Sequence, residues 1–118
     1  MIDPLAKIRE AALELPETDE LLSHGQPTFF VAGKQFAQFR NNHHGDGKIV
    51  VCVKISSLDE HAMLLEADPD TYSKPAYLPS WIAINLAGQN IDWDHVADRI
   101  AASWELAAPR RLLEAGGR

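Results

Sequence analysis

The chain has 118 residues, a size typical of one domain, with 46% hydrophobic residues, 24% charged residues and a net charge of −6. It contains no apolar run near the roughly 20 residues that a membrane helix needs, and its N-terminal segment lacks the apolar core of a signal peptide. The single cysteine, Cys52, excludes an internal disulfide framework, so we expect one cytoplasmic domain over residues 1–118 with no membrane partner.

The first predicted element is a helix that begins after Asp3 and ends before Pro16. Asp3 is a good helix cap, and Pro4 suits the first helical position because its missing N–H would have no partner there. Apolar residues recur along this segment at three- and four-residue spacing: Leu5, Ile8, Ala12 and Leu15. This spacing predicts one buried side of the helix.

A meander of three strands is predicted next. Thr28–Ala32 and Gln35–Arg40 contain all four phenylalanines, and Gly33-Lys34 between them is typical of a tight turn. After a glycine-rich loop at 41–47, Lys48–Ile55 alternates between two faces. One face holds Ile49, Val51, Val53 and Ile55, and the other holds Lys48, Val50, Cys52 and Lys54. The pattern predicts a sheet with one covered and one more open face.

The second half of the chain is predicted to close the fold. Ser57 and Glu60 have the spacing of a capping box, followed by a short helix to Ala67 with Leu58, Ala62 and Leu65 as its apolar stripe. Residues 72–79 are predicted to be irregular with a short extended piece. A strand at 81–86 and a helix from 92 to 109 follow, and 110–118 form an extension. Terminal helices on one face of an antiparallel sheet make an α+β two-layer domain.

Five segments resemble the MmcQ/YjbR family in their order and spacing: HGQPTFFVAGKQFAQF, VVCVKIS, LLEADPDTY, SWIAINL and IDWDHVADRIAASWELAAPRRL. The resemblance covers the chain from about Leu5 to Leu113. It implies a fold similar to that of CyaY, the bacterial frataxin homologue, with terminal helices on a twisted antiparallel sheet. Proteins of this kind are described as double-wing and are often labelled DNA-binding, largely because of their fold. The resemblance supplies no catalytic residues.

The segment from His24 to Thr28 raises the question of a reactive site. His24 could act as a general base and Thr28 as a nucleophile or phosphate ligand. A catalytic triad needs a third group that orients the base, and no spacing in the chain identifies one. Gly25 and Pro27 suit a bend into the first strand, and this structural interpretation is favoured. We therefore predict no catalytic residue and no enzyme activity.

Residues 21–56 form the one basic region of an acidic chain, with four Lys or Arg against a single Asp. If both hairpin tips project on one side, these groups could follow a phosphate backbone while the asparagines reach base edges. The predicted nucleic-acid contacts are Lys34, Arg40, Asn41, Asn42, His43, His44, Lys48 and Lys54. Binding to DNA would be weak and strongly salt-dependent. A solvated face with edge-blunting lysines is the alternative.

A second hypothesis places a binding site for a protein or a small molecule on the more open face of the sheet. Its candidate residues are Cys52, Tyr72, Tyr77 and Trp81. A buried small side chain is the favoured interpretation of Cys52. The other two tryptophans are expected to pack in the core.

No metal or cofactor is predicted. The adjacent His43 and His44 point to opposite sides of an extended chain and lack further ligands at a metal-binding spacing. Glu10 and Glu14 are one helical turn apart and could share a hard cation, by analogy with the acidic ridge of frataxin-type proteins. A solvated helix face explains these two residues without a metal and is the favoured interpretation.

Overall fold

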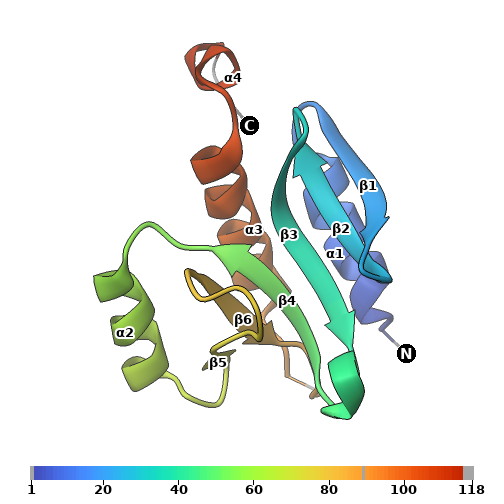
Figure 1. Ribbon diagram of the computed structural model, residues 1–118, viewed down its shortest axis with the longest axis vertical. Helices are drawn as coiled ribbons and strands as arrows, with labels where there is room; N and C mark the ends of the chain where they lie inside the picture. The colour runs from blue at the N-terminus through green and yellow to red at the C-terminus, as the bar shows by residue number, and fades with distance from the viewer. Residues whose placement is uncertain (1, 89, 116–118) are drawn as a thin grey trace.

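Six strands form one antiparallel sheet in the order β1-β2-β3-β4-β6-β5 (Figure 1). The computed structural model describes residues 2–88 and 90–115. The elements are α1 (Pro4–Leu13), β1 (Thr18–Ser23), β2 (Gln26–Val31), β3 (Lys34–Asn41), the 3-10 turn η1 (His43–Gly45), β4 (Ile49–Lys54), α2 (Leu58–Ala67), β5 (Tyr72–Ser73), β6 (Trp81–Asn85), α3 (Trp93–Ala107) and α4 (Arg110–Glu114). The predicted α+β class, with terminal helices on an antiparallel sheet, is confirmed.

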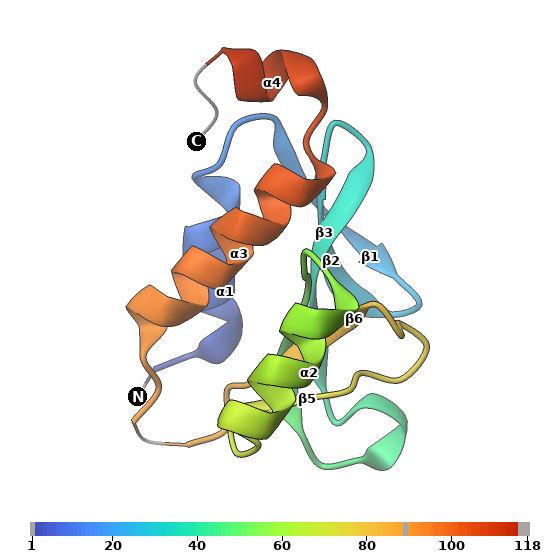
Figure 2. The same ribbon diagram turned by 90° about the vertical axis from the view of Figure 1, so that its left-hand side faces the viewer.

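Helices α1 and α3 lie side by side on one face of the sheet and form the second layer (Figure 2). The core lies between the layers, where Val51 and Val53 of β4 are fully buried, as their alternation predicts. Hydrogen bonds tie α3 to the segments that it packs against. Trp104 Nε1 donates to the Pro16 carbonyl at 3.0 Å, and Ser103 Oγ donates to the Phe36 carbonyl at 2.5 Å. The opposite face of the sheet is left free of these two helices.

The capping residues set where the helices begin. Asp3, Ser57 and Asp92 each accept a hydrogen bond from a backbone N–H in the first turn of the helix that follows, at 3.0 to 3.1 Å. These are the predicted caps, because capping depends on local sequence. Two bounds differ from the prediction. Helix α1 ends at Leu13, and the part of the predicted extension that the structure describes forms α4 after Pro109.

The meander before α2 has four strands where the sequence pattern predicts three. The additional strand, β1, has the sequence TDELLS, which lacks an apolar face, and it lies at the edge of the sheet. Pairing with β2 holds it in place. The hairpin turn is Ala32-Gly33, with φ of 47° and 84°, because Lys34 already pairs with Val31. Two consecutive residues with positive φ match the twist of a two-residue hairpin.

The predicted apolar stripe of α2 is wrong. Leu58 is 73% exposed and Ala62 is exposed too, whereas His61 is buried with its Nε2 3.1 Å from the Trp81 carbonyl oxygen. Leu64 and Leu65 are partly buried against the main core. Helix α2 packs beside the β5 and β6 end of the sheet, so its buried side is set by those contacts and not by the spacing of its leucines.

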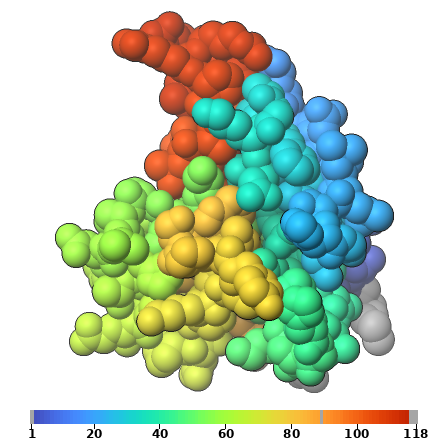
Figure 3. Space-filling model, viewed as in Figure 1, coloured from blue at the N-terminus to red at the C-terminus, as the bar shows by residue number. Residues whose placement is uncertain are grey.

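The second face of the sheet is less open than the alternation of β4 predicts. Val50 and Cys52 are buried there with Trp81, and Leu78 packs against them. Leu78 belongs to residues 74–80, a segment that crosses this face and that we call the strap. In Figure 3, which looks onto this face, the strap lies in the yellow and gold region between α2 and β3. The strap closes one side of the face and leaves the other side, over β2 and β3, uncovered.

No helix in the described ranges 2–88 and 90–115 is both long enough and apolar enough to cross a membrane.

Candidate ligand-binding pocket on the second face of the sheet

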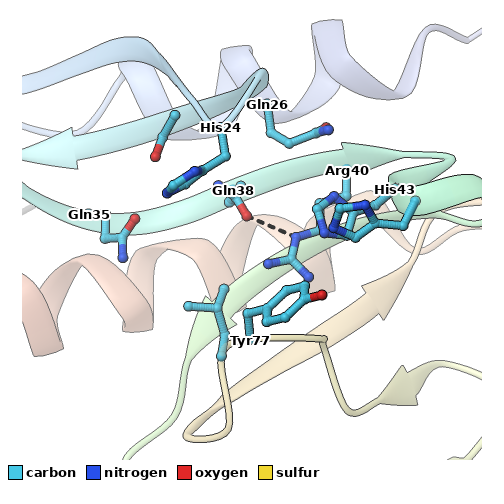
Figure 4. Close-up of a pocket in the computed structure, with 10 residues that line it drawn as sticks. His24, Gln26, Gln35, Gln38, Arg40, His43 and Tyr77 are labelled. Atoms are coloured by element: carbon cyan, nitrogen blue, oxygen red, sulfur yellow. Dashed lines mark hydrogen bonds between the residues drawn. The ribbon is translucent and has the colours of Figure 1, made fainter.

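A groove of about 510 Å³ lies where the strap meets the strands. Its walls come from four places: the β1–β2 turn, strand β3, the turn η1 and the strap. The side chains that define it are His24, Gln26, Gln35, Gln38, Arg40 and Tyr77, with Ser23, His43, His44 and Leu78 at its margins. Figure 4 shows Gln35 near one end and Arg40 with His43 near the other, with Tyr77 on the strap side. We call this groove the pocket.

A chain of hydrogen bonds runs along the floor of the pocket. Arg40 Nε donates to Gln38 Oε1 at 2.8 Å, and Gln38 Nε2 donates to Thr28 Oγ1 at 3.0 Å. The Thr28 hydroxyl in turn donates to the Gln26 carbonyl at 3.0 Å. On its other side, Arg40 Nη1 donates to the carbonyl of Ala76 in the strap at 3.0 Å. The guanidinium is therefore held between the sheet and the strap.

Arg40 is the charged member of this chain, and its charge has no partner of opposite sign. The residue is only 6% exposed, and none of the carboxylates in the described ranges forms an ion pair with it. The groups that it does contact, the Gln38 amide and the Ala76 carbonyl, are neutral. Since a guanidinium stays protonated in proteins, the pocket contains a buried positive charge that forms no ion pair with a described residue.

Aromatic rings stand beside Arg40. The His43 and His44 ring centroids are 4.0 Å apart, and the Tyr77 ring lies edge-on at 5.7 Å from His44. His43 Nε2 is buried without a hydrogen-bond partner among the described residues. Burial, together with the Arg40 guanidinium and His44, lowers the pKa of His43. We therefore expect a neutral His43 imidazole at pH 7.

Two amides of the pocket are unused by the fold. The side chains of Gln26 and Gln35 make no hydrogen bond with another described residue, in contrast to that of Gln38. Tyr77 is 79% exposed and has a φ of 65°, an unusual backbone conformation for a residue with a side chain. Donors, acceptors and a ring are thus presented to the pocket without an internal partner.

The predicted nucleic-acid residues do not form one cluster. Lys34 at the β2–β3 turn and Lys54 at the end of β4 lie toward one end of the sheet, and Lys48 precedes β4 at the other, about 20 Å away along the strands. Asn41 is exposed, whereas Asn42 Oδ1 accepts from the Gly47 N–H at 2.7 Å. Of that set, the structure brings together in the pocket the residues Arg40, His43 and His44.

The residues of the second hypothesis are divided between two faces. Cys52 and Trp81 are buried beneath Leu78, with Lys54 Nζ 5.9 Å from the Trp81 ring centroid. Burial raises the pKa of the Cys52 thiol to about 11. Tyr72 lies on the helix-covered face, where its hydroxyl is hydrogen-bonded to His95, so its assignment to this face is wrong. Tyr77 lines the pocket.

Sequence reasoning assigned no role to the glutamines of the pocket. Gln38 and Arg40 alternate with the apolar residues Ala37 and Phe39 in β3, and both are nevertheless buried. Polar residues in the middle of a strand that is predicted to be buried are the pattern that could have indicated a site there. Their use is visible only once β2 and the strap are in place.

Comparison with known proteins agrees with this architecture. A model of the YjbR family matches residues 13–106, most of the chain. The chain belongs to the YjbR family. The family resemblance found in the sequence is thereby confirmed. The crystal structure of the Deinococcus radiodurans protein DR2400, a DUF419 domain, matches with a TM-score of 0.76 over 100% of this chain and 94% of that one. Its sequence identity is 16%, so the similarity concerns the fold. Curated proteins give no match.

Proposed function

We propose that this YjbR-family domain acts by binding and not by catalysis, and that it holds a small anionic molecule in the pocket with Arg40 as its anchor. The observation that carries the proposal is the position of Arg40. This residue is only 6% exposed and lines the pocket, and its guanidinium forms no ion pair with a carboxylate of the described residues. Burying an ion without a counter-ion costs about several kcal/mol. A bound anion would offset that cost.

The hydrogen bonds around Arg40 favour a prepared site over a purely structural role. Gln38 and the Ala76 carbonyl fix the guanidinium from two sides, while Nη2 donates to no described residue. A side chain that is ordered before binding loses little conformational entropy when a ligand arrives. A guanidinium also presents parallel N–H groups that match a carboxylate or a phosphate.

Binding without catalysis is supported by the state of the candidate reactive groups. The Thr28 hydroxyl is fully buried and donates to a backbone carbonyl, so it is unsuited to act as a nucleophile. His24 lies in the exposed β1–β2 turn with no hydrogen bond to another described residue. Burial keeps the Cys52 thiol protonated. The nucleic-acid hypothesis stays a prediction of the sequence, and its test is described in the Discussion.

A titration followed by two-dimensional ¹⁵N NMR tests the proposal. The probes are inorganic phosphate and acetate, each up to tens of millimolar, with sodium chloride at equal ionic strength as the reference. We expect saturable shifts of the Arg40 side-chain N–H and of backbone amides in β3 and the strap. Arg40→Met and Gln38→Glu should abolish these shifts, the second variant because it supplies an internal carboxylate.

Lys34→Ala is the matched control, because it removes one positive charge from an exposed turn that does not line the pocket. It should leave the shifts unchanged. Shifts that are absent from the wild type, or that survive in Gln38→Glu, would show that Arg40 does not anchor an anion. A native-like spectrum of each variant ensures that a loss of binding is not a loss of folding.

A further inference from the structure

The pocket is larger than the anionic group that Arg40 can hold. Its volume of about 510 Å³ lies within the roughly 300–1,000 Å³ range of sites for drug-sized ligands. Along β3 it extends from Arg40 to Gln35, a distance of about 16 Å at the usual rise of a strand. The ligand therefore has an anionic end and an elongated body.

The charge around Arg40 fits a phosphate better than a carboxylate. A second, small cavity of about 50 Å³ shares Arg40 and His43 with the pocket and is lined also by Lys48, Lys74 and Asp46. With His43 neutral, these three cations and one carboxylate give this corner a net charge of +2. A phosphate monoester carries about −1.5 to −2 at pH 7, whereas a carboxylate carries a single charge.

The remainder of the pocket offers the chemistry that recognises a planar, hydrogen-bonding ring. The free amides of Gln26 and Gln35 each present a donor and an acceptor, the combination that pairs with the edge of a nucleobase. His24 presents an exposed ring in this part of the pocket, whereas His44 and Tyr77 stand beside Arg40, and Gln26 lies opposite Arg40 in the pairing of β2 with β3. Rings of this kind stack on bases. Figure 4 shows His24 and Gln35 away from the Arg40 end, toward which the body of the ligand would lie.

We infer that the pocket takes a nucleoside monophosphate, with its phosphate on Arg40 and its base at the other end, between Gln35 and His24. This inference rests on the proposed function, since it uses the same anchor. It adds the chemical identity of the uncharged part of the ligand, which Arg40 alone does not specify. No Asp or Glu is among the described residues that line the pocket, so no carboxylate there would repel the phosphate.

The test is calorimetry at pH 7 and 0.15 M salt with AMP, GMP, CMP and UMP, each compared with its nucleoside and with ribose 5-phosphate. We expect at least one monophosphate to bind about tenfold or more tightly than both of its fragments. Arg40→Met should reduce its affinity to that of the nucleoside. His24→Ala should weaken it by about tenfold, in line with one lost stacking contact. Lys34→Ala should change nothing.

Paired variants distinguish the two proposals. Gln35→Leu and His24→Ala should weaken the binding of the monophosphate and leave the binding of ribose 5-phosphate unaltered. If ribose 5-phosphate binds as tightly as every monophosphate, in a manner that depends on Arg40, the nucleotide inference is overturned and the proposed function stands. If neither binds, both proposals fail. Tighter binding of a single-stranded oligonucleotide than of any monophosphate would overturn the assignment of a small-molecule ligand.

Discussion

Arg40 and Gln38 lie two residues apart on β3 and are joined by a hydrogen bond of 2.8 Å from Nε to Oε1, with each residue 6% exposed. Residues at this spacing share one face of a strand, so the amide and the guanidinium meet on the face that the strap covers. The neutral amide orients the charge without neutralising it. This relationship distinguishes a prepared anion site from an internal ion pair, and changing position 38 can separate folding from binding.

Gln38→Glu should keep or raise the stability of the fold while it abolishes anion binding. The new carboxylate would form a charge-assisted hydrogen bond with Arg40, a type that contributes about 1.5–3 kcal/mol. Gln38→Leu should instead lower the free energy of unfolding by about 1–3 kcal/mol, because it leaves the Arg40 Nε–H without its acceptor and the Thr28 hydroxyl oxygen without its donor. Urea denaturation measures both values. A Glu variant less stable than the Leu variant would contradict this account of Arg40.

Cys52 should resist thiol reagents in the folded protein. It is fully buried between the sheet and the strap, and burial raises the pKa of its thiol to about 11. Little thiolate, the reactive form, is then present at pH 8. Ellman's reagent at pH 8 should label the urea-unfolded chain within minutes and the native chain only at the rate of global unfolding. Rapid labelling of the native chain would mean that the strap opens readily.

The free energy of unfolding should fall as the pH is lowered from 7.5 through about 6.5 toward 5. The pKa of His43 is lower in the folded protein than its usual value, because burial and Arg40 disfavour the imidazolium. In that interval the unfolded chain binds more protons, so acid favours unfolding. Urea titrations at pH 7.5, 6.0 and 5.0 measure the effect.

His43→Gln provides the comparison for this pH dependence. It removes the titrating ring and keeps a polar side chain in η1, so the variant should lose less stability than the wild type between pH 7.5 and 5.0. Contributions from the other titrating groups are common to both proteins and cancel in the difference. Equal losses in the two proteins would show that His43 does not contribute.

The nucleic-acid hypothesis makes a different prediction about the surface lysines. A fluorescent duplex should bind weakly at low salt, and each of Lys34→Ala, Lys48→Ala and Lys54→Ala should reduce the slope of log K against log salt by about 1. The hypothesis also includes Arg40, but that guanidinium lies within the pocket under the strap, where a duplex does not fit, so Arg40→Met should have less effect than the lysine variants. Absence of binding at low salt would dismiss the hypothesis. A strong effect of Arg40→Met would place nucleic acid in the pocket.

Much of the fold was predictable because its signals are local. The caps at Asp3, Ser57 and Asp92 act within one helical turn, and the alternation of Val51 and Val53 acts within one strand. Strand β1 escaped prediction because its stability comes from pairing with β2, and not from its own pattern. The buried side of α2 could not be predicted for a similar reason, because its contacts with β5 and β6 determine which side of the helix is buried.

The sequence by itself determined the family, through the resemblance of five segments. It also determined the α+β class and most of the helix and strand positions, because short-range capping and periodicity specify them. It also identified Arg40 as a notable cation, but placed it on an exposed face that could meet DNA. Only the tertiary structure decided its surroundings, through a hydrogen bond to Ala76, 36 residues further along the chain. The burial of Arg40 and its lack of an ion pair with any described residue arise from such distant contacts, and the proposed anion site rests on them.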